Sequence, residues 1–234
     1  MIKMNIVFAY PTGLNPQKGG VERITDIIAK ILLKRGYTIF YLNWKREQDN
    51  YEYPVPVIDL PSSNLEDPNN LEVYNRFLKE NRIDVIINQH GLYEGTYFLS
   101  QVKVQNVKII SVLHSDPFGY YNHLFADLMT LRDSSIKEKV KRVARFFLYR
   151  KVKKIIHRSL VNHYTFIQEH PQYVCLLSES YKERLEEYCD LPDNYFISIP
   201  NPNTYENIEI IPHKEPILLF VGRLDNRSKK LFTL

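Results

Sequence analysis

Three parts of the sequence could carry chemistry, and the first is a glycine pair near the N-terminus. Gly19 and Gly20 end a loop rich in glycine and proline, just before a helical pattern that begins at Val21. Glycine lets a ligand approach the backbone closely, and the free N–H groups at a helix N-terminus suit phosphate. The loop contains neither a dinucleotide fingerprint nor a P-loop pattern. Gly19 and Gly20 therefore either contact an anionic ligand or form a glycine-rich turn without one.

The second part is a pair of histidines that follow apolar stretches. His114 comes directly after the stretch at 107–113, and His90 follows the preceding stretch at 83–87 in a similar way. In a parallel α/β sheet, ligands bind beyond the carboxyl ends of the strands. We therefore expect both imidazoles to line one cleft. Asp116 is a further polar candidate there, although Asp before Pro is also a common turn former.

The third part is a basic turn near the end of the chain. Arg223 and Lys229 follow an apolar stretch at 217–222, with further bases around them. Such a turn would suit a diphosphate, and the alternative is a solvated basic tail.

The elements that must position these residues alternate between strands and helices. The apolar patterns predict strands at 5–10, 38–42, 55–58, 83–87, 107–113, 173–177 and 196–199. They predict helices that begin at Val21, around 71–78, at 96–104, from Ile136 as one long amphipathic helix, and from Ser178 or Ser180. This alternation predicts an α/β fold with a doubly wound, mostly parallel sheet of the Rossmann-like kind.

Proline content marks the expected domain boundary. Residues 200–216 contain four prolines and little periodicity, which is typical of a linker. We expect one domain over 1–203, a linker over 204–216, and the first strand and basic turn of a second domain over 217–234.

Composition excludes several classes of protein. The 234 residues are 44% hydrophobic and 25% charged, as in a globular chain, and no apolar run approaches the length of a membrane span. The N-terminus lacks the features of a signal peptide, and the two cysteines, Cys175 and Cys189, lack metal-ligand spacing. We expect a cytoplasmic protein, with a peripheral position on the inner face of the membrane as a further option.

That option rests on one basic segment. Residues 136–158 hold ten Lys/Arg and a single acid, which indicates a local anionic partner. One hypothesis is a helix on anionic lipid with Lys151, Lys153 and Lys154 facing the membrane and the apolar stripe turned inward. The alternative is a core-facing helix with a basic outer surface. A nucleic-acid partner is not expected, because exposed aromatic residues do not alternate with the bases.

In order along the chain, these segments resemble family 4 of the retaining glycosyltransferases with the GT-B fold. Residues 19–23 resemble the first-loop motif of the family, and 114–116 resemble its His-Asp element. Residues 177–180, 199–203 and 220–224 resemble the end of the first domain and the opening of the second. The resemblance spans nearly the whole chain. It implies the acceptor-side half of an enzyme that transfers a sugar from a nucleotide-sugar to a glycan or lipid-linked acceptor in cell-surface polysaccharide biosynthesis.

The resemblance also implies roles for single residues. His114 matches the histidine that approaches the transferred sugar, so it is the candidate catalytic residue. Donor phosphates are expected at Gly19, Gly20, Arg223 and Lys229. The cleft and its acceptor side are assigned to Glu22, Arg23, His90, Asp116 and Tyr93. Tyr93 is assigned from its residue type and not from the resemblance: its ring could stack on a sugar, and the alternative is ordinary packing in a loop. The family generally needs no metal, and we expect neither a metal nor another cofactor.

The sequence also departs from the family pattern. Ser115 separates His114 from Asp116, and Pro202 and Lys230 stand where glycine is common. The glutamate pair of the second domain is not found before Leu234. We therefore expect this chain alone not to turn over. Two alternatives stay open: a nucleotide-sugar epimerase of the same architecture, and a non-catalytic half that pairs with a separate donor domain.

Overall fold

The computed structural model describes residues 3–45, 50–91, 94–119, 121, 124, 136–170, 172–186, 192 and 195–202. Within these ranges seven strands form one sheet in the order β3-β2-β1-β4-β5-β6-β7. Every neighbouring pair is parallel. The strands are β1 (Asn5–Ala9), β2 (Thr38–Asn43), β3 (Val57–Asp59), β4 (Val85–Asn88), β5 (Lys108–Leu113), β6 (Gln172–Leu176) and β7 (Phe196–Ser198). The predicted α/β class and doubly wound sheet are confirmed, and the described sheet is wholly parallel.

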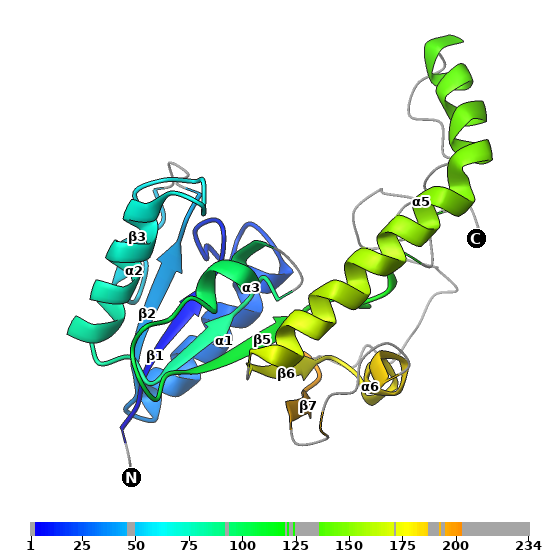
Figure 1. The fold of residues 1–234 in the computed structure, drawn as a ribbon. Helices are drawn as coiled ribbons and strands as arrows, with labels where there is room; N and C mark the ends of the chain where they lie inside the picture. The colour runs from blue at the N-terminus through cyan, green and yellow to red at the C-terminus, as the bar shows by residue number, and fades with distance from the viewer. Residues whose placement is uncertain are drawn as a thin grey trace, which may run out of the picture. The chain divides into compact units, whose positions relative to one another are not determined.

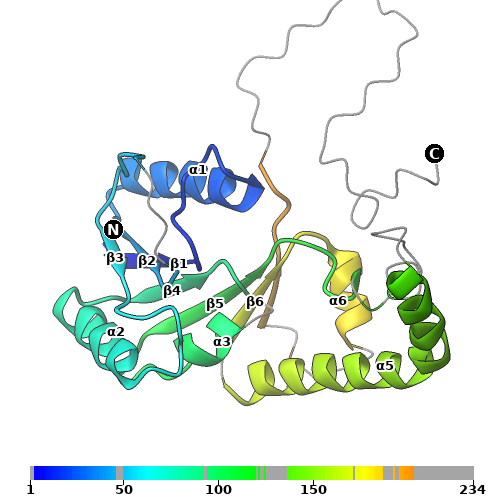
Figure 2. The same cartoon turned by 90° about the horizontal axis from the view of Figure 1, so that it is seen from above.

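Helices cover both faces of this sheet. Helix α1 (Gly20–Lys34) lies on one face, and α2 (Pro68–Glu80) and α3 (Glu94–Leu99) lie on the other (Figures 1 and 2). Along β1 the side chains alternate between two cores: Ile6 and Phe8 belong to the cluster on the α1 face, and Val7 and Ala9 belong to the cluster with α2 and α3. A strand buried on both faces is apolar throughout, which is why this stretch shows no polar alternation.

The start of α2 is fixed by local chemistry. The carboxylate of Asp67 accepts a hydrogen bond from the backbone N–H of Asn69 at 2.9 Å, and Pro68 occupies the first helical turn. Proline is well placed there because the N–H that it lacks has no partner inside the helix.

Helix α3 is shorter than the predicted helix over 96–104, since it ends at Leu99. The backbone N–H of Lys103 instead donates to Oδ1 of Asn75 on α2 at 2.6 Å. This bond holds the following chain in an irregular path, in which Val102 and Val104 pack against the core.

The chain divides into two compact units. The first comprises residues 1–117 and 161–202 and contains the sheet. The second comprises 118–160 and 203–234, and its described part consists mainly of the first 25 residues of α5 (Ile136–Glu169). The predicted linker and second-domain strand lie outside the described residues, so the predicted domain boundaries stay a prediction.

The long helix is confirmed, but its predicted amphipathic character is wrong. The apolar residues of α5 do not keep to one face over its 34 residues, because their positions drift around the helix axis. Between 139 and 160 several large apolar side chains are exposed instead of turned inward: Val140, Val143, Phe146, Phe147, Leu148 and Ile155. No helix in the described part of the chain combines the length and apolar character that a membrane span requires.

Candidate functional site at the carboxyl edge of the sheet

A cavity of about 390 Å³ lies where the strand order reverses. Strand β1 lies between β2 and β4. The strands β2 and β3 are added on one side of β1, and the strands from β4 onward are added on the other side. Ligands of open α/β sheets bind in the crevice outside such a switch point. The lining comes from the ends of β1, β4 and β5 and from the first turn of α1: Tyr10, Val21, Gln89, His90, Gly91, Val112, Leu113, His114 and Ser115.

His114 is held in one orientation by a neighbouring amide. Its Nε2 atom lies 2.5 Å from Oε1 of Gln89, a residue that is almost wholly buried. An amide oxygen can only accept a hydrogen bond, so the imidazole carries its proton on Nε2 and keeps an acceptor lone pair on Nδ1. Burial lowers the pKa of His114 to about 4. The ring is therefore neutral near physiological pH and can accept a hydrogen bond from a hydroxyl group.

His90 forms an aromatic corner of the same cavity. Its ring lies edge-on to Tyr10, with centroids 6.1 Å apart, and 6.0 Å from the ring of the buried Trp44. Burial lowers the pKa of His90 to about 4, a shift that Lys45 reinforces and Glu94 opposes. The structure thus brings His114 and His90 to one cavity, as predicted. Both imidazoles are neutral near physiological pH.

A buried polar network holds the loop that carries His90. Oδ1 of Asn88 accepts the backbone N–H of His90 at 3.0 Å. The Asn88 amide donates to Oγ1 of Thr96 at 3.0 Å and to Oγ of Ser111 at 3.3 Å. All three network side chains are fully buried, so each bond satisfies a group that has no access to water.

Gly91 is a closely packed point of the cavity wall. A Cβ atom at this position would lie 2.7 Å from the carbonyl oxygen of Val112 and 2.9 Å from a methyl group of Leu113. Only glycine allows the loop after β4 to approach the end of β5 so closely.

His163 supports this wall from α5, and it was not predicted from the sequence. Its Nε2 atom lies 3.1 Å from the carbonyl oxygen of Gly91, and its Nδ1 atom lies 3.1 Å from the hydroxyl of Tyr97. No motif surrounds His163. The apolar spacing of Val161, Tyr164 and Ile167 could have indicated a buried helix face beside it.

The predicted glycine pair has two different surroundings. Gly19 caps α1, and a Cβ atom there would collide with Oε2 of Glu22, whose side chain is buried. At Gly20 nothing lies within 4 Å of the position of a Cβ atom. The open space is therefore beside Gly20, next to the cavity residue Val21. Neither Glu22 nor the exposed Arg23 belongs to the described lining.

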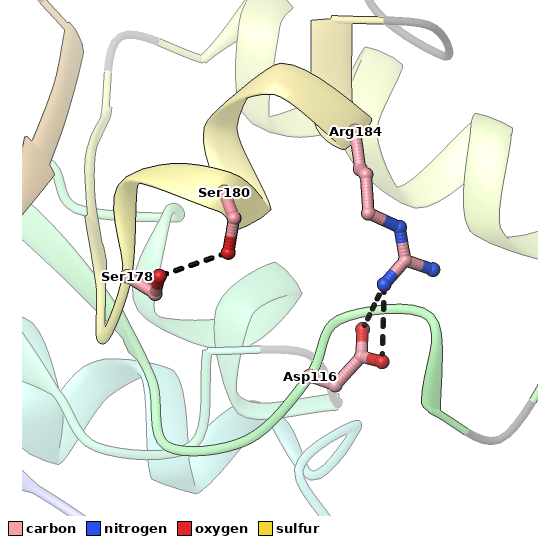
Figure 3. Close-up of polar contacts among 4 residues, drawn as sticks. All are labelled: Asp116, Ser178, Ser180 and Arg184. Atoms are coloured by element: carbon pink, nitrogen blue, oxygen red, sulfur yellow. Dashed lines mark hydrogen bonds and ion pairs between the residues drawn. The ribbon is translucent and has the colours of Figure 1, made fainter.

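Asp116 is paired with another side chain at the same sheet edge (Figure 3). Its carboxylate oxygens lie 3.2 and 3.4 Å from Nη1 of Arg184 on α6 (Glu179–Glu186). The hydroxyls of Ser178, just before α6, and Ser180, within its first turn, lie 2.9 Å apart. Asp116 is outside the described lining of the cavity, and its pairing with Arg184 is the role that the structure gives it.

The other predicted site residues fall outside the described residues or in the second unit. Tyr93, Arg223 and Lys229 lie outside the described residues. The three lysines belong to the second unit: Lys151 and Lys154 are exposed, while Nζ of Lys153 lies 4.9 Å from the centre of the Tyr121 ring. Among the described residues no group of three or more His, Cys, Asp or Glu side chains is arranged to hold a metal ion. The expectation of a metal-independent site stays a prediction.

Comparisons with known proteins give weak likenesses to solved structures. WaaG, a glycosyltransferase involved in lipopolysaccharide biosynthesis, is 15% identical over 86% of this chain and 46% of its own, with a TM-score of 0.45. The enzyme WbmH of Bordetella bronchiseptica, solved with NAD+, is 11% identical over 74% of this chain and 55% of its own, with a TM-score of 0.38. A putative epimerase from Burkholderia cenocepacia is 12% identical over 74% of this chain and 52% of its own, with a TM-score of 0.33.

The chain spans about half the length of these structures, and the likenesses concern the fold alone. No protein-family model matches the sequence, and no curated protein sequence does.

Proposed function

We propose that this chain forms the acceptor-side half of a glycosyltransferase that uses a nucleotide-sugar donor. The observation that carries the proposal is the cavity at the switch point, where His114 and His90 stand beside the N-terminus of α1. A sugar presents hydroxyl donors, and a nucleotide-sugar adds a diphosphate. The cavity offers a neutral acceptor for the first and lies beside a positive helix end for the second.

His114 would bind the transferred sugar as a hydrogen-bond acceptor. The lone pair on its Nδ1 atom is available because the proton is on Nε2, which donates to Oε1 of Gln89. With a pKa of about 4, the imidazole near neutral pH carries its single proton on Nε2, where it is bonded to Gln89, and has no proton on Nδ1 to give. His114 would therefore orient a sugar hydroxyl in the transition state without acting as a general acid.

The donor phosphates would lie against the start of α1. Gly20 offers the open approach there, and the buried carboxylate of Glu22 occupies the space beside Gly19. Arg223 and Lys229 would neutralise the diphosphate as it leaves, which is often a large catalytic contribution. The proposed transfer retains the configuration of the sugar and uses no metal ion.

The acceptor would be a glycan or a lipid-linked glycan at an anionic membrane surface. Support comes from the first part of α5, where exposed Val140, Phe146 and Phe147 accompany exposed bases such as Lys151 and Lys154. Apolar side chains that enter the headgroup region, together with bases that attract anionic lipid, are the two components of interfacial binding. Both apolar and basic residues would then face the lipid, in contrast to the predicted inward stripe.

Saturation-transfer NMR with a panel of nucleotide-sugars tests the proposed donor site. The sugar ring protons should receive more saturation than the base protons, because in the proposed complex the cavity residues would surround the sugar end. His114→Ala should abolish that transfer. The matched control is His170→Ala, since His170 is exposed and does not line the cavity. Stronger saturation of the base, or unchanged transfer in His114→Ala, would contradict the assignment.

Vesicle co-sedimentation tests the membrane part separately. Reversing Lys151, Lys153 and Lys154 to Glu should weaken binding to anionic vesicles roughly 100-fold or more, at about 1 kcal/mol for each base. The control reverses Lys34 and Lys108, which are exposed residues of the first unit. Phe147→Ser should weaken binding as well, because this side chain is 78% exposed and would enter the lipid. Equal binding to neutral and anionic vesicles would overturn this part.

A further inference from the structure

Two cavities outside the candidate site form one groove along α2. A cavity of about 570 Å³ lies at the N-terminal end of the helix, and one of about 640 Å³ lies toward its C-terminal end. Both are lined by Pro68 and Leu71, so they adjoin. Together they are called the α2 groove here. None of the residues that line the switch-point cavity takes part in it.

The groove has an apolar floor and one regular wall. Helix α2 contributes residues at helical spacing, from Pro68 through Leu71 and Asn75 to Lys79, which therefore lie on one helix face. The opposite side at the N-terminal end comes from α3, which lies on the same face of the sheet (Figure 2). There the ring of Tyr97 remains 41% exposed. A partner would thus find apolar surface between charged rims.

The two ends of the groove carry opposite charge. The acids Glu66, Asp67 and Glu94 line the N-terminal end, and none of the described residues lining that end is basic. The C-terminal end is lined by three bases and one acid: Arg76, Lys79, Lys103 and Glu72. Asp67 and Lys79 are twelve positions apart, so the ends are separated by about 18 Å along the helix.

The distribution of charge along the groove would allow two copies to pair. When one groove is rotated by 180° relative to the other, the acidic end of each faces the basic end of the other. A second copy, rotated by 180° about an axis near the middle of α2, places its basic end over the acidic end of the first. In such an isologous contact every acid–base pair forms twice. We propose that the α2 groove binds the α2 groove of a second copy of this chain, so that two antiparallel α2 helices form a homodimer.

The ion pairs already present do not oppose this pairing. Glu94 lies 3.2 Å from Lys45 and Arg76 lies 3.6 Å from Glu72, and all four side chains are about half exposed or more. Exposed pairs contribute little to stability, so they can exchange for pairs with the second copy. The dimer contact is independent of the proposed glycosyltransferase activity, and either can fail without the other.

Sedimentation velocity of the full chain over a range of concentrations tests the proposal through a charge swap. Wild type should show a concentration-dependent dimer. Glu66→Lys, and separately Lys79→Glu with Lys103→Glu, should each weaken it at least tenfold, because like charges then face each other at both ends. An equimolar mixture of the two variants should restore a dimer, since the reversed charges complement each other. Glu80→Lys is the matched control, because Glu80 is an exposed acid of α2 that does not line the groove.

The mixture also distinguishes loss of the dimer contact from misfolding, because an unfolded variant would not form a dimer when the other variant is added. A wild-type chain that stays monomeric at every concentration would overturn the proposal. So would a dimer that both groove variants leave unchanged, or a mixture that remains monomeric. Capture of a different protein on the groove by a monomeric chain would likewise contradict the second copy as its occupant.

Discussion

His163 donates the proton on its Nε2 atom to the carbonyl oxygen of Gly91, 3.1 Å away. A carbonyl only accepts, so Nδ1 is left to accept the hydroxyl proton of Tyr97. Burial lowers the pKa of His163 and keeps this neutral tautomer in place. The last turns of α5 are thereby joined to the wall of the switch-point cavity.

Removing His163 should cost more stability than removing the Tyr97 hydroxyl. His163→Ala leaves the buried carbonyl of Gly91 without its donor, which we expect to cost about 2–3 kcal/mol. Tyr97→Phe removes a bond from a side chain that is 41% exposed, for which we expect about 0.5–1 kcal/mol. Urea unfolding followed by circular dichroism measures both. Equal losses in the two variants would contradict this ranking.

Gly91→Ala should also be destabilising, for a steric reason. The new methyl group would lie 2.7 Å from the carbonyl oxygen of Val112, and backbone cannot move away as a side chain can. We expect a loss of about 1–3 kcal/mol, as for overpacked cores. The matched control is Gly20→Ala, where the same methyl group meets open space. A Gly91→Ala variant as stable as that control would refute the close packing.

The two glycines before α1 should respond differently to alanine. Gly20→Ala should be neutral or stabilise by up to about 0.5 kcal/mol, because alanine is the better helix former. Gly19→Ala should destabilise, since its methyl group would collide with the carboxylate of the buried Glu22. Glu22→Ala should relieve part of that loss, and a double-mutant cycle should show a coupling of about 0.5 kcal/mol or more. If the changes in the free energy of unfolding of the two single variants simply add in the double variant, Glu22 does not restrict residue 19.

Stability should fall as the pH is lowered, because of the two cavity histidines. The folded-state pKa of both His90 and His114 is about 4, against 6.5 for an exposed histidine. The unfolded chain therefore binds more protons, so their stabilising effect is complete above pH 6.5 and is lost as the pH falls toward 4. After allowance for partial exposure we expect a combined loss of roughly 2–3 kcal/mol near pH 4.5. Urea unfolding at several pH values should show a flatter dependence in the variant with His90→Gln and His114→Gln, and an unchanged dependence would exclude this cause.

Much of the fold could be predicted because its signals are local. Apolar runs such as Asn5–Ala9 mark strands buried on both faces, and their alternation with helices specifies a parallel sheet. In a parallel sheet the carboxyl ends of the strands lie at one edge, so His90 and His114, which follow two of these strands, could be predicted to share one cavity. The helix over 96–104 was predicted too long: it ends at Leu99, and beyond it the backbone N–H of Lys103 bonds to Asn75 on another helix, a contact that the local sequence does not show.

The rest of the site depends on distant contacts. The contact between His163 and Gly91 joins residues 72 positions apart, and no spacing in the sequence encodes it. The pairing of Asp116 with Arg184 is of the same kind. The prediction that an apolar stripe of α5 faces inward was wrong, because a helix can carry apolar residues that its own domain does not cover. Phe147 is an example.

The most direct test of the proposed donor site observes the imidazole of His114 itself. A long-range ¹H–¹⁵N correlation spectrum should show Nε2 protonated and Nδ1 unprotonated, as the bond to Gln89 requires. On titration with a nucleotide-sugar to about 10 mM, well above a millimolar dissociation constant, the Nδ1 resonance should shift as it accepts a sugar hydroxyl. The imidazole of the exposed His170 should not respond. A proton on Nδ1 of His114, or a resonance that no nucleotide-sugar moves, would contradict the account.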